Sequence, residues 1–396
     1  MSRVKILTAI SLVIFLTSCG QKTEPQSFAD LGEAGSSKAV TIPIDLPNFS
    51  DDRLALTVQG LDYSQSMELI DIRGVGDSGW SRTHQQRPLN PEFGRALDQF
   101  DVSGTSYRGD LSFVNWESVV GESCNQFANQ YTPGQSYAFV SHPANIVQAF
   151  EKGFRLFGLS NNHSRDCVSA SGFASGTDMS TQWMDQLAQK YQDLMWHGLS
   201  RQPGNKRFPM IKSYRIKNRQ LTVAFASLYT GRKNCPDSVC LDDAPSVLAE
   251  FKRSRADLKI LAIHSGFTGE KEVVDIGMRF IQDSDGDIVF GHGPHVWKAV
   301  RVVAKPNQKK GVIFESLGNF IHPNLAARKE NYIGRALFDK NTMSLRQVQI
   351  IPVHNQGMSA QFSSANGAQV PTNLTWKQTE WLLGNQLVRG VYSNIR

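Results

Sequence analysis

Long basic runs and long apolar runs are both scarce in this chain of 396 residues, and each absence excludes a class of protein. No run of five or more Lys or Arg residues occurs, and 42 basic residues face 36 acidic ones, a net charge of +6. This charge is too mild and too evenly spread to indicate a nucleic-acid partner. Only one early stretch is continuously apolar, which excludes a protein with several membrane-spanning helices. With 40% hydrophobic and 20% charged residues, the chain is expected to form a globular body.

The apolar stretch belongs to a segment with the features of a secretory signal. Arg3 and Lys5 precede an apolar run at 6–16, which is much shorter than the roughly 20 residues that cross a bilayer. Small residues then lead to Cys19, as in bacterial lipoprotein signals, where this cysteine is acylated and becomes the mature N-terminus. The alternative is an ordinary cleaved signal in which Cys19 has no role.

Changes in composition along the sequence divide the chain into four segments. We predict a lipoprotein signal peptide at 1–18, a flexible polar tether at 19–50, a folded body at 51–365 and a helical extension at 366–396. The lipid would anchor the body to a membrane of the cell envelope, outside the cytoplasm. No Asp follows Cys19, which favours the periplasmic side of the outer membrane if the cell is Gram-negative.

Four further cysteines are present, and an even number in an oxidising compartment favours disulfides. Cys235 and Cys240 flank a polar turn and would close a small loop, which would leave Cys124 to pair with Cys167. The sequence leaves open which of the three possible disulfide connectivities of these four cysteines is formed. A zinc site is the alternative, but the chain has neither a CxxC motif nor closely clustered Cys and His residues.

Short apolar segments rich in β-branched or aromatic residues alternate with helical patterns along the body. Strands are predicted at 55–59, 69–75, 111–115, 156–159, 221–227, 258–263, 287–290 and 312–317. Helices are predicted at 91–100, 143–152, 179–191, 246–255 and 272–283. Later strands near 334–338 and 344–353 look antiparallel, and a terminal helix is predicted near 374–386. Continuous apolar strands that precede helices indicate an α/β body whose sheet is covered on both faces.

Polar side chains follow strand after strand. The residues at these six strand ends are Asp77, Asn115 with Glu117, Asn162 with His163, His264, His292 with His295, and Asn319. Because the carboxyl ends of strands in an α/β sheet line the ligand crevice, these groups are expected to meet at one edge. Imidazoles, carboxylates and amides together favour a site for two transition-metal ions, Mn, Fe or Zn.

Each of these residues also has an ordinary structural explanation. A single Asp or Asn after a strand is usually a turn or cap residue, and a single His is usually packed or at the surface. The pair His292 and His295 is more specific, because two imidazoles three residues apart on a glycine-entered turn cannot both belong to a strand core. The combination of motifs favours the metal site.

The order of the motifs carries a family resemblance. Gly-Asp, Asn-x-Glu, Asn-Asn-His-x-x-Asp, His-x-Gly, Gly-His-x-Pro-His and Ser-Leu-Gly-Asn-Phe follow one another over roughly residues 70–325. This series resembles the CapA-type poly-γ-glutamate capsule synthesis family, which is similar to calcineurin-like metallophosphoesterases. The resemblance implies a four-layer αββα sandwich with a binuclear metal site on the strand-end loops.

The resemblance also implies roles for individual residues. The metal ligands would be Asp77, Glu117, Asn162, His264, His292 and His295, with Glu117 bridging the two ions. His163 would protonate the leaving group, and Asp166 would hold that imidazole in the required tautomer. Arg82, Asn115 and Asn319 are the candidate substrate contacts. Of the remaining histidines, only His322 follows a motif closely enough to line the same mouth.

Three functions remain open at this point. The first is a lipid-anchored, metal-dependent hydrolase that acts on a phosphoester or an envelope polymer. The second is a non-hydrolytic factor that works with polymer-synthesis machinery in the synthesis, export or attachment of an anionic polymer such as poly-γ-glutamate. The third is a metal-free scaffold of the envelope.

Overall fold

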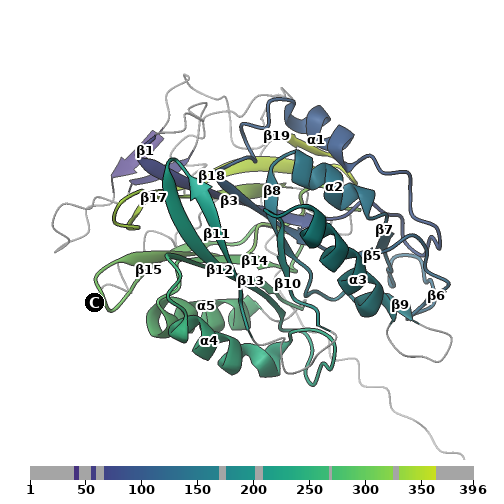
Figure 1. Ribbon diagram of the computed structural model, residues 1–396. Helices are drawn as coiled ribbons and strands as arrows, with labels where there is room; N and C mark the ends of the chain where they lie inside the picture. The colour runs from purple at the N-terminus through teal and green to yellow at the C-terminus, as the bar shows by residue number, and fades with distance from the viewer. Residues whose placement is uncertain are drawn as a thin grey trace, which may run out of the picture.

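The computed structural model describes residues 40–43, 55–58, 67–168, 175–200, 208–266, 270–323 and 330–362 (Figure 1). Cys19, the predicted signal peptide and the predicted terminal helix near 374–386 lie outside these residues. Within the described part, no helix has the length and apolarity needed to cross a membrane. The first strand, β1 (Val40–Pro43), falls inside the segment predicted as a tether, because three of its four residues are β-branched.

The first sheet has nine strands among the described residues. In spatial order it contains β1, β2 (Ala55–Val58), β18 (Leu345–Asn355), β17 (Glu330–Asp339), β3 (Leu69–Ser78), β4 (Leu111–Trp116), β8 (Phe154–Gly158) and β10 (Met195–His197), with β19 (Ala360–Phe362) paired to β18. Strands β3, β4, β8 and β10 are parallel, so their carboxyl ends share one edge. Strands β17 and β18 are antiparallel, as predicted.

The second sheet has six strands in the described part of the chain. Its order is β11 (Met210–Ile216), β12 (Arg219–Tyr229), β13 (Leu258–His264), β14 (Ile288–His292), β16 (Lys310–Phe314) and β15 (Val300–Ala304). Strands β12, β13, β14 and β16 are parallel. Two short pairs flank the sheets, β5 (Val119–Val120) with β7 (Val140–Ser141) and β6 (Gln126–Phe127) with β9 (Cys167–Val168).

Helices lie on opposite sides of the two sheets (Figure 1). They are α1 (Phe93–Asp101), α2 (Ala144–Glu151) and α3 (Ser175–Lys190) on one side, and α4 (Ala244–Arg253) and α5 (Glu270–Ser284) on the other, with the 3-10 helix η2 (Leu241–Asp243) before α4. The five helices predicted between strands are all present, with ends shifted by a few residues. The predicted α/β class is confirmed.

Aromatic side chains join the two sheets face to face. Phe113 of β4 stacks on Phe290 of β14 with ring centroids 5.0 Å apart, and Phe290 stacks on Phe314 of β16 at 5.6 Å. Both sheets contribute to this fully buried cluster. Separate buried clusters join α1, α2 and α3 to the first sheet and α4 and α5 to the second. Burial of such side chains, about 1.5–3 kcal/mol each, holds the sheets in the register that positions their ends.

A close backbone approach connects the ends of the two sheets. The backbone N–H of Asp77 donates to the carbonyl of Gly318 at 2.8 Å. A Cβ atom on Gly76 would lie 2.0 Å from that same carbonyl oxygen, so only glycine fits before Asp77. Gly318 has φ +71°, in the left-handed region that favours glycine. These two glycines therefore bring the loop after β16 against the end of β3.

His197 at the end of β10 is a buried neutral histidine that belongs to the fold. Its Nδ1 accepts a hydrogen bond from the Ser227 backbone N–H at 2.9 Å, and its Nε2 donates to the Phe208 carbonyl at 3.1 Å. Burial lowers the pKa of His197 from 6.5 to about 4, so protonation opposes folding.

We predict that His197 contributes acid sensitivity to stability. The unfolded chain takes up this proton below pH 6.5 and the folded protein does so only near pH 4, so stability is lost as the pH falls through that window, by up to about 3 kcal/mol. Urea unfolding of His197→Gln should show a shallower fall in the free energy of unfolding between pH 6.5 and 4 than the wild type. His142→Gln, at a half-buried histidine, is the matched control. Equal slopes for His197→Gln and wild type would contradict this assignment.

Candidate metal centre

The predicted strand-end residues converge where the two sheets meet. Asp77 is the ninth residue of β3 and Glu117 directly follows β4, while His264 and His292 are the last residues of β13 and β14. The register pairs His264 with His292 across the parallel strands. All four side chains are buried. Parallel pairing in both sheets therefore brings together residues that lie far apart in the sequence.

Asp77 lies at one end of the cluster, surrounded by nitrogen atoms. Its Oδ1 accepts a hydrogen bond from Asn115 Nδ2 at 2.7 Å and lies 3.3 Å from His292 Nδ1 and 3.6 Å from His264 Nδ1. Its Oδ2 lies 3.3 Å from His295 Nδ1. Both oxygens of this fully buried carboxylate therefore face imidazoles.

Glu117 lies at the centre of the cluster, with a different histidine pair near each oxygen. Its Oε1 is 3.5 Å from His264 Nε2 and 3.9 Å from His163 Nε2. Its Oε2 is 3.4 Å from His322 Nε2 and 3.8 Å from His295 Nδ1. This carboxylate thus lies between two pairs of imidazole nitrogens, and each of its oxygens could join one pair in binding a cation.

Several of these buried polar atoms have no hydrogen-bond partner among the described residues. They are both carboxylate oxygens of Glu117, both ring nitrogens of His292 and the Nε2 of His322. An unsatisfied buried polar group costs about 1–3 kcal/mol, so a concentration of such atoms calls for a ligand that accepts their lone pairs. A cation meets that requirement.

Two overlapping sets of ligand atoms have the compactness of a metal site. One set is Asp77, Glu117 and His264, and the other is Glu117, His295 and His322; within each set the ligand atoms lie within 4.8 Å of one another. Glu117 belongs to both. Carboxylate oxygens mixed with imidazole nitrogens suit divalent transition metals, so the residues present fit the expected cofactor.

The charges of the cluster are mutually dependent. Burial and the neighbouring charge of Asp77 raise the pKa of Glu117 to about 8. Burial lowers the pKa of His264 to about 4 and that of His322 to about 3, which keeps both imidazoles in the neutral form that binds metals. Burial opposes a charge on His295 as well, but Glu117 and Asp77 outweigh it and raise the pKa of His295 to about 9. Positive charge is favoured at the centre of the cluster.

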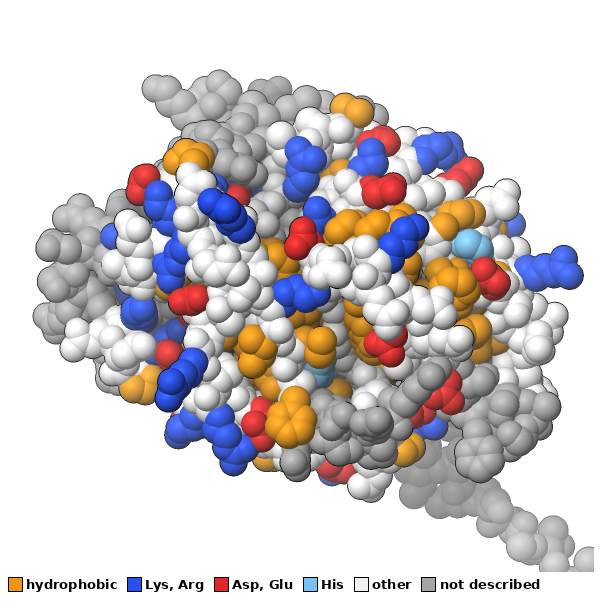
Figure 2. Space-filling model, in the orientation of Figure 1, with side chains coloured by type: hydrophobic (Ala, Val, Ile, Leu, Met, Phe, Trp, Pro, Cys, Tyr) orange, Lys and Arg blue, Asp and Glu red, His pale blue; other side chains and the backbone are white. Residues whose placement is uncertain are grey.

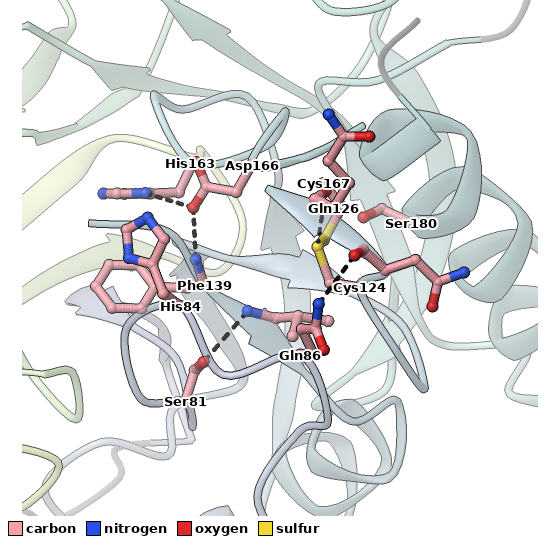
Figure 3. The surroundings of a disulfide bond; sticks show 12 residues. Ser81, His84, Gln86, Cys124, Gln126, Phe139, His163, Asp166, Cys167 and Ser180 are labelled. Carbon is pink, nitrogen blue, oxygen red and sulfur yellow. Dashed lines mark hydrogen bonds and ion pairs between the residues drawn. A yellow bond between two sulfur atoms is a disulfide. The ribbon is translucent and has the colours of Figure 1, made fainter. Parts of the chain in front are cut away.

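His163 and Asp166 form a separate hydrogen-bonded pair beside Glu117. His163 Nδ1 lies 2.7 Å from Asp166 Oδ2, and the same oxygen accepts the backbone N–H of Phe139 at 2.6 Å (Figure 3). Burial opposes protonation of His163, but the Asp166 carboxylate outweighs it and raises the pKa of the imidazole. The aspartate therefore holds the ring orientation and leaves Nε2 on the Glu117 side.

A cavity of about 510 Å³ opens next to this pair. Its lining residues are Asn129, Gly134, Gln135, Ser136, Tyr137, Asn162, His163, Asp166 and His295. The volume is in the range of small-ligand sites. A ligand in this cavity would reach both the His163–Asp166 pair and, through His295, the metal-ligand cluster, which is the group of candidate ligands Asp77, Glu117, His264, His292, His295 and His322.

The Cys124–Cys167 disulfide fastens the cavity wall to the His163–Asp166 pair. Its Cα atoms are 5.5 Å apart, and Cys167 directly follows Asp166 (Figure 3). Strand β6, just after Cys124, pairs with β9, and the Ala128 N–H donates to the Asp166 carbonyl at 2.7 Å. The arm that begins at Cys124 is thereby held on the segment that carries His163.

The second predicted disulfide is absent. Cys235 and Cys240 are buried thiols that are not bonded to each other. The backbone N–H of Cys235 donates to Cys240 Sγ at 3.2 Å, so this sulfur serves as a hydrogen-bond acceptor that closes the turn. The prediction from even cysteine number was wrong for this pair, because a short loop can be held by a thiol acceptor as well as by a bridge.

The three candidate substrate contacts have different positions from those expected. Asn115 is buried between Asp77 and His264, with its Nδ2 3.1 Å from His264 Nδ1, and so positions two ligands. Asn319 Oδ1 lies 2.9 Å from His295 Nδ1 and positions that ring. Arg82 is exposed and does not line the cavity. A further predicted ligand, Asn162, does line the cavity, and its buried Oδ1 has no hydrogen-bond partner in the described part of the chain.

His322 is the residue that sequence reasoning did not place among the ligands. It lies two residues beyond Phe320, in a loop that the close approach of Gly318 to Asp77 carries into the site. Its position three residues after Asn319 was the only indication. The structure makes it a ligand candidate as strong as His295.

Two solved structures are distantly similar to this chain. A structure of a hypothetical protein from Thermus thermophilus has 10% sequence identity and a TM-score of 0.43, with 72% of this chain and 100% of that chain covered. A structure of PhoD has 9% identity and a TM-score of 0.33, with 87% of this chain and 81% of that chain covered.

Comparisons of sequence agree with the order of the motifs. A curated relative, the capsule biosynthesis protein CapA of Bacillus anthracis, is 28% identical over 184 residues, or 43% of this chain. The matched region is 41% of that relative, so the chain spans less than half of its length. The family model of the bacterial capsule synthesis protein PGA_cap matches residues 75–324, which include the metal-ligand cluster and the His163–Asp166 pair. Because this match covers more than half of the chain, the protein belongs to the PGA_cap family of bacterial capsule synthesis proteins.

Proposed function

We propose that the protein is a metal-dependent, phosphoesterase-like hydrolase of the cell envelope that acts in capsule biosynthesis. The observation that carries this proposal is the position of Glu117, fully buried, with each oxygen facing its own histidine pair and neither oxygen hydrogen-bonded to the described residues. A structural carboxylate would be paired, so the cluster is better explained as a binding site for two cations that share Glu117.

The residues that would hold the two ions come from both sheets. They are Asp77, Glu117, Asn162, His264, His292, His295 and His322. Divalent transition metals bound by such ligands supply Lewis acidity and a water of lowered pKa, the requirements for phosphoester hydrolysis. Asn115 and Asn319 hold His264 and His295 in place through hydrogen bonds of their side-chain amides.

His163 is placed to act as the general acid. The imidazole lines the cavity, while its Nδ1 is held by Asp166 and its Nε2 remains for a ligand. Asp166 raises the pKa of the imidazole, which favours the protonated form that a general acid needs. Asp166 is itself held by the Phe139 backbone, so the pair is oriented before substrate arrives.

The finer architecture and the location are parts of the same proposal. We propose a four-layer αββα sandwich, supported by one buried cluster between the sheets and one between each sheet and its helices. We propose lipid attachment at Cys19 and an envelope location outside the cytoplasm. The Cys124–Cys167 disulfide supports that location, because such bonds persist in oxidising compartments.

The second candidate function is a non-hydrolytic factor in the synthesis, export or attachment of an anionic envelope polymer, with polymer-synthesis machinery as its partner. The observation that favours it is the CapA relative, whose name refers to biosynthesis. Under this hypothesis the cluster would bind metal without turnover, so metal content and activity must be measured separately.

We predict that the purified protein binds one or two Mn, Fe or Zn ions per chain and that His292→Ala loses at least one of them. His292 is fully buried, and neither of its ring nitrogens makes a hydrogen bond to the described residues, so its removal should take away a metal ligand beside Asp77. Plasma mass spectrometry after chelator-free purification and reconstitution measures the stoichiometry. His142→Ala, outside the cluster, is the control and should retain the wild-type content. Wild-type protein without metal under these conditions would contradict a metal centre.

We predict that His163→Gln lowers metal-dependent phosphodiester cleavage by about 10²-fold or more. The loss should be larger for a methyl ester than for a p-nitrophenyl ester, because p-nitrophenolate leaves without a proton.

Asp166→Asn should move the alkaline limb of the pH–rate profile to lower pH, because the pKa of His163 falls when the carboxylate is removed. Full metal content without turnover of either ester would favour the non-hydrolytic function.

A further inference from the structure

One wall of the cavity is a loop, residues 129–137, that the metal-ligand cluster does not use. Asn129, Gly134, Gln135, Ser136 and Tyr137 line the cavity from this loop, together with residues of the site itself. The loop continues the arm that begins at Cys124, which the disulfide and the β6–β9 pair hold beside Asp166. The wall is therefore fixed relative to His163.

The lining is polar but has little charge. None of the described residues that line the cavity is Lys or Arg, and the Asp166 carboxyl and the rings of His163 and His295 belong to lining residues outside the loop. On the face of the molecule in Figure 2, basic and acidic side chains are interspersed. Recognition of a polyanion along this wall would call for Arg or Lys side chains. The part of the lining that the loop supplies, Asn129, Gly134, Gln135, Ser136 and Tyr137, instead suits a neutral, hydrogen-bonding ligand.

Part of the loop's hydrogen-bonding capacity maintains its own shape. Ser136 Oγ donates to the Gln130 carbonyl at 2.5 Å and accepts the Thr132 N–H at 2.7 Å. Asn129 Nδ2 donates to the Tyr137 carbonyl at 3.2 Å, and Asn129 Oδ1 lies 2.7 Å from His84 Nε2. These bonds make Asn129 and Ser136 supports of the wall.

Two other side chains remain available to a ligand. No hydrogen bond joins the side-chain amide of Gln135 or the hydroxyl of Tyr137 to the described residues, and Gln135 is exposed. The Tyr137 ring stacks near Phe139, with centroids 6.4 Å apart and planes 18° apart, and the Phe139 ring centroid lies 4.6 Å from that of His163. The Tyr137 ring therefore lies against the buried Phe139 ring, which in turn contacts His163.

We propose that this wall is a subsite for a neutral, hydroxyl-rich glycan unit. The Gln135 amide offers a donor and an acceptor for neighbouring hydroxyls, and the Tyr137 ring offers an apolar face with a polar edge for a sugar ring. A peptide would be expected to pair along a free backbone edge, but the N–H groups of Gln135 and Ser136 both donate to the Thr132 carbonyl at 3.0 Å. The binding of a glycan to this wall does not depend on the proposed function. Only the placement of the glycan on the leaving-group side of the substrate rests on it.

The test is a binding titration of the purified protein, metal-loaded and EDTA-treated, by saturation-transfer NMR. The probes are triacetylchitotriose and maltotriose as neutral glycans, γ-linked triglutamate as an anion, and acetyl-trialanine amide as a neutral peptide. We expect a neutral glycan to bind best, and Gln135→Ala and Tyr137→Phe each to raise its Kd about 3- to 10-fold, as for the loss of one hydrogen bond. Gln130→Ala, in the same loop but outside the lining, should leave the Kd unchanged.

The subsite proposal is overturned if neither glycan binds, if triglutamate or the peptide binds more tightly than both glycans, or if the two variants bind the glycan as the Gln130→Ala control does. Binding in EDTA-treated protein separates this result from the metal proposal. A protein that binds the glycan but retains no metal contradicts only the hydrolase, and a metal-loaded hydrolase without glycan binding contradicts only the subsite.

Discussion

Glu117 is a carboxylate in the interior of the molecule with no hydrogen-bond partner among the described residues, and the rest of the site is arranged around it. Several histidines and a second buried carboxylate lie close by, so a negative charge there is stabilised only by protons or cations shared with these neighbours. Burial raises the pKa of Glu117, with help from the charge of Asp77, and lowers the pKa of His264 and of His322. At His295 the carboxylates of Glu117 and Asp77 outweigh burial and raise the pKa. A compact group of buried carboxylate and imidazole atoms without hydrogen-bond partners among the described residues is able to hold a metal ion.

The fold provides this cluster through the carboxyl ends of parallel strands. Strands β3 and β4 bring Asp77 and Glu117 from one sheet, and strands β13 and β14 bring His264 and His292 from the other. The stacked rings of Phe113 and Phe290 hold the sheets together close to these residues, and the Phe113 ring centroid lies 5.3 Å from that of His292. Core packing and ligand placement therefore depend on the same side chains.

The cavity wall adds a feature that the metal ligands do not require. A disulfide fastens a polar, weakly charged loop to the residue next to Asp166. An anionic polymer would find few complementary charges on this loop, whereas bound cations would attract a phosphoryl group at the cluster itself. Under the two proposals, the site would divide into a region for charge and a region for hydroxyl groups, as a phosphoester of a neutral glycan would require.

Much of the site was predictable from the sequence because strands and their polar ends are local patterns. Apolar runs located β3, β4, β13 and β14, and the residues at or just after their ends gave Asp77, Glu117, His264 and His292. The His163–Asp166 pair was also predictable, since its members are three positions apart in one turn. Strand β10 was missed because it is short, and strand β11 because its pattern is largely exposed.

Long-range geometry decided the remainder. His322 enters the cluster only because Gly76 and Gly318 let two backbones approach, and Asn115 turns toward Asp77 because the core places it there. Cys235 and Cys240 have the spacing of a bridge, yet the turn directs one sulfur to a backbone N–H. By itself the sequence determined the family, the α/β class and the kinds of ligand atoms, because those follow from residue type and local periodicity. Which side chains contact one another was decided by tertiary structure, because contacts between sheets depend on packing that no local pattern records.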